Sequence, residues 1–216
     1  MHFDALTAPE QRVFGCLIEK RFTTPDQYPL SLNALRLACN QSTNRDPVVA
    51  YTEETVRDAA QRLSRYGLAR LASGHSSRAT KYRHLAEEAL GLDREQLAVL
   101  VVLLLRGPQT SGGLRGRSER VVDWPSLAAV EQVLDQLIER GYAARLERRP
   151  GQKEERFVQL LGGEMPAEQE ISPADADNSL HQLDPGAGES ELAARLDALE
   201  RRFDQLAGAV SELLGR

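Results

Sequence analysis

The chain has 216 residues, of which 41% are hydrophobic and 27% are charged, which is enough for one large domain or two small ones and too polar for a membrane protein. The longest apolar run, Leu97–Leu105, is far shorter than the roughly 20 residues that cross a bilayer, and the N-terminus lacks the basic-then-apolar order of a signal peptide. We therefore expect a cytoplasmic protein that makes no contact with a membrane.

The net charge of -5 is unevenly distributed along the chain. Lys and Arg slightly outnumber Asp and Glu up to Gly163, whereas acidic residues dominate from Glu164 onward. The acidic total therefore does not argue against nucleic-acid binding by the first part of the chain, although the positive excess there is small.

Residues 1–88 predict a winged-helix domain. Three amphipathic helices are expected in this range, each beginning after a residue that can cap a helix: Thr7, Ser31 and Thr52. Gly67 ends the third helix. Two short strands, at 68–72 and 80–85, follow with a polar turn between them. Three helices followed by a β-hairpin is the element order of a winged helix.

The same order recurs in residues 89–163, which predict a second winged helix. Helices are expected after Asp93 and Thr110 and over 126–140, with Gly141 ending the last of them. A strand, a polar turn and another strand come next. Three residues of the first copy correspond to three of the second, and the distance along the sequence is the same for each pair. These pairs are Val56 and Val130, Leu63 and Leu137, and Gly67 and Gly141. The first copy differs by an insertion, Asn40–Tyr51, between its second and third helices.

The rest of the chain changes in character at Gly163. Residues 164–188 are acidic and contain several prolines, so they predict a flexible linker. Residues 189–216 predict a coiled-coil helix and a homodimer, because apolar residues alternate at spacings of four and three. A single amphipathic helix that folds back on the domains is the alternative. The fold class is thus α+β, mostly α. The seam of the coiled coil consists of Leu192, Leu196, Leu199, Phe203, Leu206, Val210 and Leu213.

The residue types that carry enzyme chemistry form no catalytic pattern. The histidines have no Cys or His partner at metal-ligand spacing, and the glycines at 112–113 lack the lysine and the preceding strand of a phosphate loop. Cys16 and Cys39 stand among apolar residues of expected helices, so we predict reduced, buried thiols. We expect no enzymatic activity, no metal and no cofactor.

Several segments of the first copy carry a family resemblance. Tyr28–Leu35, the loop that begins at Asn40, and Ser77–Arg83 together make the chain similar to the YceH-like family of bacterial proteins. The resemblance implies a tandem winged-helix fold and no established biochemical activity. One departure is Gly113, where the family usually has Glu. The most specific part is the family-motif loop, with Asn40, Gln41, Asn44, Arg45, Asp46 and Pro47.

Two interpretations of this loop are open. In the first, its polar side chains bond to nearby backbone groups and fix the angle of the third helix, as Asn and Asp do in turns. In the second, Asn44 and Arg45 reach a phosphate group or a partner chain.

Winged helices most often place the third helix in the major groove of DNA and the hairpin against the backbone. The third helices are poor candidates here, because acids balance the arginines in 52–66 and outnumber them in 126–140. The hairpins and the segment 115–120 are richer in Lys and Arg, although exposed strands also carry such residues to block edge pairing. The expected nucleic-acid-binding residues are Arg57, Gln61, Ser64, His75, Arg78, Lys81, Arg83, Arg115, Arg117, Arg148, Arg149 and Lys153.

Two functions follow from these patterns. The first is a dimeric protein of transcription-regulator type that binds double-stranded DNA, with hairpin cations on phosphates and the coiled coil setting the half-site spacing. The second is a scaffold that binds a protein partner, similar to chromosome-segregation subunits of this architecture. The acid-free first hairpin favours DNA and the third helices favour the scaffold; we prefer DNA slightly. RNA is a weaker third option, since aromatic residues for base stacking are scarce. A further hypothesis is that the acidic tail masks the basic hairpins.

Overall fold

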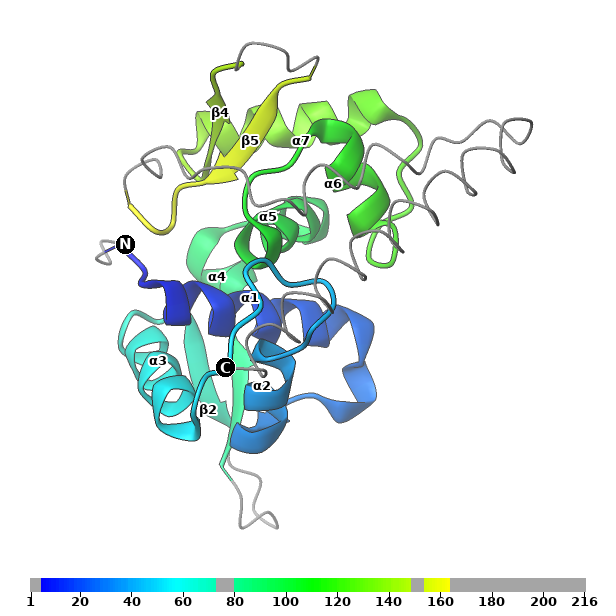
Figure 1. Cartoon of the computed structure of the whole chain (residues 1–216). Helices are drawn as coiled ribbons and strands as arrows, with labels where there is room; N and C mark the ends of the chain where they lie inside the picture. The colour runs from blue at the N-terminus through cyan, green and yellow to red at the C-terminus, as the bar shows by residue number, and fades with distance from the viewer. Residues whose placement is uncertain (1–4, 73–79, 149–153, 164–216) are drawn as a thin grey trace, which may run out of the picture. The chain divides into compact units, whose positions relative to one another are not determined.

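A computed structural model describes residues 5–72, 80–148 and 154–163 (Figure 1). The chain divides into two compact units, Met1–Met165 and Pro166–Arg216, and every described residue belongs to the first. The predicted linker at 164–188 and the predicted coiled-coil helix at 189–216, with all its seam residues, therefore lie outside the described residues.

The described unit is a mixed α+β structure with small antiparallel sheets, as the sequence predicts for the class. In the first half, the predicted caps are confirmed for two helices, since the hydroxyl groups of Ser31 and Thr52 accept hydrogen bonds from Ala34 N and Thr55 N. At Thr7 the backbone N–H donates to the Glu10 carboxylate. The elements of this half are α1 (Ala8–Thr23), the 3-10 turn η1 (Pro25–Gln27), β1 (Leu30–Ser31), α2 (Leu32–Cys39), α3 (Glu53–Arg65), β2 (Ala69–Ala72) and β3 (Lys81–His84).

The three strands of this half form one sheet in the order β1-β3-β2, with both pairs antiparallel. The two-residue strand β1 is not among the predicted elements. It pairs Leu30 with Tyr82 and so covers the edge of the hairpin that β3 forms.

The second half repeats this order after a short connecting helix, α4 (Ala86–Leu90), which crosses the predicted domain boundary. The predicted caps Asp93 and Thr110 each accept a hydrogen bond from the first turn of their helix, and Ser126, which the sequence predicts inside its helix, does the same for α7. Gln109 forms an isolated bridge to Phe157, in the place that β1 takes in the first half. The further elements are α5 (Arg94–Arg106), α6 (Ser111–Ser118), α7 (Leu127–Glu139), β4 (Ala143–Leu146) and β5 (Arg156–Gln159).

We call α1 to β3 the first repeat and α5 to β5 the second repeat. Their correspondence extends to the backbone, because Gly67 and Gly141, which follow α3 and α7, both have a φ of 74°. L-residues with a side chain rarely adopt this conformation, so glycine is required at both turns.

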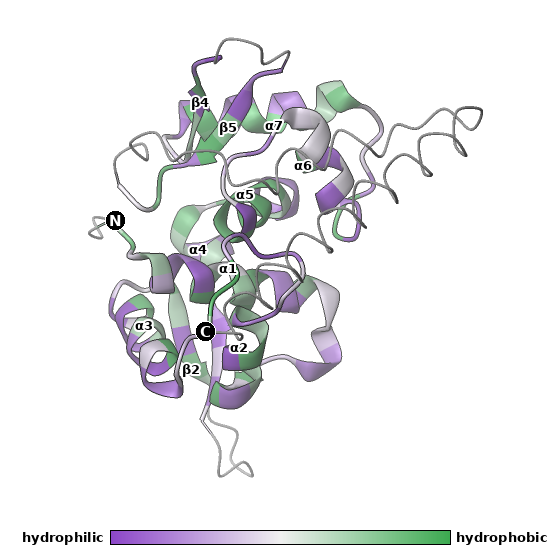
Figure 2. Ribbon diagram, viewed as in Figure 1, coloured by the Kyte–Doolittle hydropathy of each residue, from purple (hydrophilic) through white to green (hydrophobic). Residues whose placement is uncertain are grey.

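Helix α5 lies at the centre of the described unit. Every residue from Gln96 to Leu105 is buried, and α5 packs on α1 as well as on α6, α7 and β5. A helix that is buried on all sides has no polar face, which explains the longest apolar run of the sequence. Figure 2 shows α5 as largely hydrophobic.

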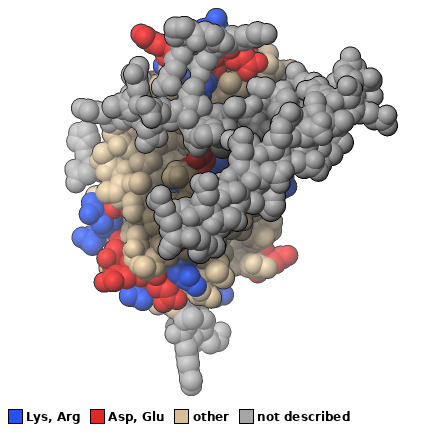
Figure 3. Space-filling model, viewed as in Figure 1, with Lys and Arg blue, Asp and Glu red and all other residues tan. Residues whose placement is uncertain are grey.

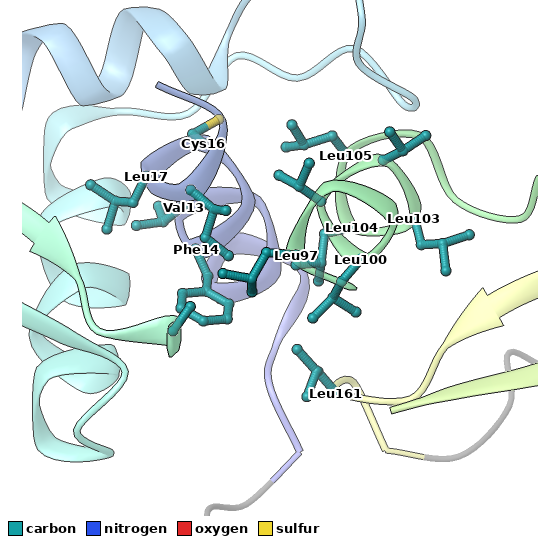
Figure 4. Packing of buried hydrophobic residues seen from close by; sticks show 14 of the residues in the cluster. Val13, Phe14, Cys16, Leu17, Leu97, Leu100, Leu103, Leu104, Leu105 and Leu161 are labelled. Atoms are coloured by element: carbon teal, nitrogen blue, oxygen red, sulfur yellow. The ribbon is translucent and has the colours of Figure 1, made fainter. Parts of the chain in front are cut away.

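The two repeats meet where α1 packs on α5. Leucines of α5 face Val13 and Phe14 of α1, as Figure 4 shows from close by. At Gly15 the helices approach so closely that an added Cβ would lie 2.8 Å from Leu105 Cδ2. The absence of a side chain at Gly15 therefore allows this contact between the repeats.

Candidate functional site

The first repeat presents a basic surface on its sheet. Arg70 and Arg83 are direct cross-strand partners, and Lys81 pairs with Ala72. Because side chains alternate along a strand, these three cations lie on the same side of the sheet. Tyr82 and His84 lie on the other side and are buried. We call Arg70, Lys81 and Arg83 the basic sheet face.

The cations of the basic sheet face are not held in ion pairs in the described part of the chain, although Glu87 and Glu88 line the same pocket as Arg83. None of its three cations forms an ion pair with a described residue. Like charges directly opposite each other in a sheet destabilise it, so the Arg70–Arg83 pair is costly for the fold alone and favourable for binding an anion.

Arg70 is the cation of this face that our sequence-based set omits. Its signal is present in the sequence, because 68–72 is predicted as a strand and alternation places Arg70 opposite the buried positions. Lys81 and Arg83 are in the predicted set and lie half-buried on this face. His75 and Arg78 lie outside the described residues.

Helix α3 is a weaker candidate for contact with nucleic acid. The predicted contact residues Arg57 and Gln61 are exposed, but Ser64 is half-buried and its hydroxyl donates to Ala60 O. Arg62 lies 2.5 Å from the buried carboxylate of Glu10. Blue and red side chains alternate over the lower part of the face in Figure 3, where α3 lies, so this surface has no uniform positive potential.

The hairpin of the second repeat has its own acidic partners. Arg145 lies 3.0 Å from Glu155 and 3.4 Å from Asp135, and Arg148 also lies 3.4 Å from Glu155. The predicted residues Arg149 and Lys153 lie outside the described residues. The second hairpin is therefore less suited to phosphate contacts than the basic sheet face. The two remaining predicted residues, Arg115 and Arg117, are half-buried on α6.

The family-motif loop is held by Arg45, whose side chain is fully buried. Its guanidinium group binds both carboxylate oxygens of Glu19 on α1, at 2.6 and 3.0 Å. The remaining N–H groups donate to Ala38 O, Asn44 O and Gln41 Oε1, so all five donors are used. Burial opposes the charge, but the hydrogen bonds and charge of Glu19, together with the neighbouring Cys16 and Cys39, outweigh burial and raise the pKa of Arg45.

Further contacts join this loop to both repeats. The Asn40 side chain exchanges two hydrogen bonds with the backbone of Tyr51, at 2.8 and 2.9 Å. Asp46 N donates to Leu105 O at the end of α5, and Arg106 donates to Asn44 Oδ1. Figure 1 shows the loop between α2 and α3 reaching α5.

The first interpretation of the loop is thus favoured for Arg45, which is committed to the fold and has no donor left for a phosphate. Asn44 differs from Arg45 in its surroundings, because it lines a cavity beside α5 that is described below in connection with a ligand. Gln41 accepts from Arg45 Nη2 at 2.9 Å, and Arg12 of α1 donates to Pro47 O at 2.7 Å. The family-motif residues therefore act together as one hydrogen-bonded anchor.

His84 is the only histidine among the described residues, and it is buried. Its backbone N–H donates to the Tyr28 hydroxyl at 2.6 Å, and its Nδ1 accepts from Ala86 N at 3.2 Å. Burial lowers the pKa of His84, although Glu87 and Glu88 oppose this, while Arg21 and Arg83 add to it. The neutral imidazole is therefore the form that the fold stabilises.

Acidification should destabilise the protein through His84. The unfolded state takes up a proton near the ordinary pKa of about 6.5, whereas the folded state does so only at lower pH. The stability that comes from keeping His84 neutral is therefore fully present above the ordinary pKa of about 6.5, and it falls as pH decreases below that pKa. We expect His84→Gln to lose less stability than the wild type between about pH 7.5 and about pH 5.5 in urea unfolding. The control is His181→Gln, which changes a histidine of the predicted linker 164–188, and an equal pH dependence in both variants would contradict the assignment.

No group of three or more His, Cys, Asp and Glu side chains within 5–72, 80–148 and 154–163 could hold a metal ion. Both cysteines are free and buried, as predicted. None of the helices in the described ranges combines the length and the apolar character of a membrane span.

Comparison with known proteins shows the family to which the amino-acid sequence of this chain belongs. A family model described as a protein of unknown function, DUF480, matches residues 6–152. The UPF0502 protein of Solibacter usitatus is 45% identical over 204 residues, which cover 93% of this chain and 95% of that protein. The chain belongs to the DUF480 family. The UPF0502 protein of Geotalea daltonii is 52% identical over 170 residues, or 78% of each chain, and that of Pelobacter propionicus is 44% identical over 214 residues, or 98% of this chain and 97% of that one.

Membership of the DUF480 family agrees with the resemblance to the YceH-like family, and the family description assigns no function. The part of the chain that matches the DUF480 model contains the family-motif loop and the whole basic sheet face. It ends before β5, so the last strand of the second repeat lies outside the match.

Proposed function

We propose that this protein is a non-enzymatic tandem winged-helix protein that binds double-stranded DNA through backbone contacts. The observation that carries the proposal is the basic sheet face, where three cations share one side of a sheet and have no acidic partner among the described residues. Arginine and lysine side chains in such a position neutralise phosphates and release counterions.

The element order supports the winged-helix part of the proposal. Each repeat has three helices and a terminal hairpin, and a short extended segment before the second helix pairs with the last strand. In this layout β2 and β3 are the wing, and α3 and α7 are the third helices. The wing then contributes more to DNA affinity than α3 does, so the proposed affinity has modest sequence specificity.

The proposed molecule is a homodimer. In this proposal, the predicted seam at 189–216 joins two copies and so presents two wings to one duplex. Two modules that bind one duplex together gain affinity through their effective concentration, so the experiment below uses the full chain.

Binding of a mixed-sequence duplex, followed by fluorescence anisotropy at several salt concentrations, tests the proposal. The double variant Arg70→Ala/Arg83→Ala should bind more weakly and should reduce the slope of log K against log[salt] by about 1 for each phosphate that is no longer neutralised. The matched control is Arg145→Ala/Arg148→Ala, which also removes two hairpin arginines but from ion pairs. Its loss of affinity should be smaller.

The absence of binding at low salt would overturn the DNA proposal, as would equal losses in the two double variants. Unfolding curves of both variants establish that the fold is intact.

A separate observation favours the scaffold as the second candidate. The outer side of α7 carries Glu131, Asp135 and Glu139 as exposed residues, together with Leu127 at 39% exposure. That surface is suited to a basic protein partner.

A further inference from the structure

A cavity of about 190 Å³ opens where the two repeats meet. It is lined by α1, the family-motif loop, α5 and α6, together with the residues that follow α6. Four of its lining residues come from α5 and are apolar and buried: Ala98, Val101, Val102 and Leu105. The cavity therefore has a hydrophobic floor.

The rim of the cavity is cationic. Arg106, Arg117 and Arg120 line it, and Arg120 is exposed. Among the described residues that line the cavity, the carboxylate is that of Glu19, and Arg45 binds both of its oxygens. This carboxylate is thus paired with Arg45 within the fold, and Arg106 and the exposed Arg120 are the cations that the rim offers to an anion.

The state of Arg106 reflects this crowding of positive charge. Burial lowers the pKa of its guanidinium group and the neighbouring Arg117 and Arg45 lower it further, whereas the carboxylates of Asp46 and Glu19 oppose this shift. Arg106 donates to Asn44 Oδ1, so the family-motif loop fixes its position at the rim. An anion at the rim would offset the mutual repulsion of these cations.

The volume restricts the size of a ligand. A dry apolar cavity of about 150 Å³ accepts benzene, whereas pockets for drug-sized molecules begin at about 300 Å³. A cavity of 190 Å³ therefore suits a single ring or a short branched chain.

We propose that this cavity binds a small amphipathic carboxylate, with its apolar part on the α5 floor and its carboxylate at the arginine rim. Arginine is suited to this role because its planar N–H groups match both carboxylate oxygens. The proposal is independent of DNA binding, since none of the three residues of the basic sheet face lines the cavity.

The protein contains a built-in reporter for this site. Trp124 is the only tryptophan of the chain, and its indole N–H donates to Ser118 Oγ at 2.7 Å. Ser118 lines the cavity. Occupation of the cavity should therefore change the emission of Trp124.

The experiment titrates the full chain with benzoate and follows Trp124 emission, with isothermal titration calorimetry as the second measurement. Benzamide has the same shape without the charge, benzamidine carries the opposite charge, and inorganic phosphate is an anion without an apolar part. We expect saturable binding of benzoate and at least tenfold weaker binding of all three other probes. Equal binding of benzamide would overturn the charge requirement, and equal binding of phosphate would overturn the role of the floor.

Two variants locate the site. Arg120→Gln removes an exposed rim cation and should weaken benzoate binding about tenfold, as the loss of one charge-assisted hydrogen bond does. Val102→Phe fills the floor and should abolish binding. The matched control is Arg57→Gln, which removes an exposed arginine from α3 and should leave the affinity unchanged. Unchanged affinity in Arg120→Gln, or an equal loss in Arg57→Gln, would overturn the proposal.

Discussion

Replacement of Arg45 with alanine should lower the free energy of unfolding by about 3–5 kcal/mol, the range found when one partner of a buried ion pair is removed. The Arg45 side chain has 0% exposure and that of Glu19 has 17%. The variant loses five hydrogen bonds and leaves the Glu19 carboxylate with only Lys20, 3.6 Å away, as an ionic partner among the described residues. The measurement is urea unfolding, with the loss seen as a lower midpoint.

Three companion variants make this result specific. Arg57→Ala removes an exposed arginine and should change stability by no more than about 0.5 kcal/mol. Arg45→Lys keeps the charge but cannot match both oxygens of Glu19, so it should remain well below the wild type in stability. A double-mutant cycle with Glu19→Gln measures the coupling directly. If Arg45→Ala were as stable as Arg57→Ala, the anchoring role of the loop would be wrong.

Replacement of Leu100 with alanine should cost about 2–5 kcal/mol and should weaken both repeats together. Leu100 is fully buried on α5, at the contact with α1 that Figure 4 shows. Because α5 packs on both repeats, the cavity left by this change lies in a core that they share. Unfolding followed by Trp124 emission and by far-UV circular dichroism should give coincident transitions, each at a lower urea concentration than in the wild type.

The control for this prediction is Leu71→Ala, which removes the same side chain from a position with 47% exposure. Its cost should be much smaller, because little apolar surface returns to water. Separate transitions for the two probes would contradict the shared core, since Trp124 belongs to the second repeat and circular dichroism reports on all helices.

Local features of this fold are predictable from the sequence because their causes are local. Helix caps such as Ser31 and Thr52 bond to groups three residues away, and Gly67 and Gly141 recur because each turn needs a positive φ. The apolar pattern of each helix likewise predicts its buried face. These signals suffice for α1, α2, α3, α5, α6 and α7, for the hairpins and for the repeated order, whereas α4 is not among the predicted elements.

The remaining features depend on contacts between distant residues. The pairing of Leu30 with Tyr82 and the bridge from Gln109 to Phe157 join segments that no local pattern connects. The same holds for the candidate sites. Composition indicates that the first hairpin is basic, but only the register places Arg70 beside Arg83. Nothing in the sequence near Arg45 indicates that Glu19 is its partner.

The insertion Asn40–Tyr51 also makes the contact between the two repeats directional. In the first repeat it carries the backbone N–H that satisfies the carbonyl of Leu105 at the end of α5, and with it the side chain that binds Arg106. The second repeat has no equivalent insertion between α6 and α7, so it offers no such docking element to a further copy. The contact that the loop makes therefore has a direction, from the first repeat to the second, in contrast to solenoid proteins, in which like units stack on one another in the same way.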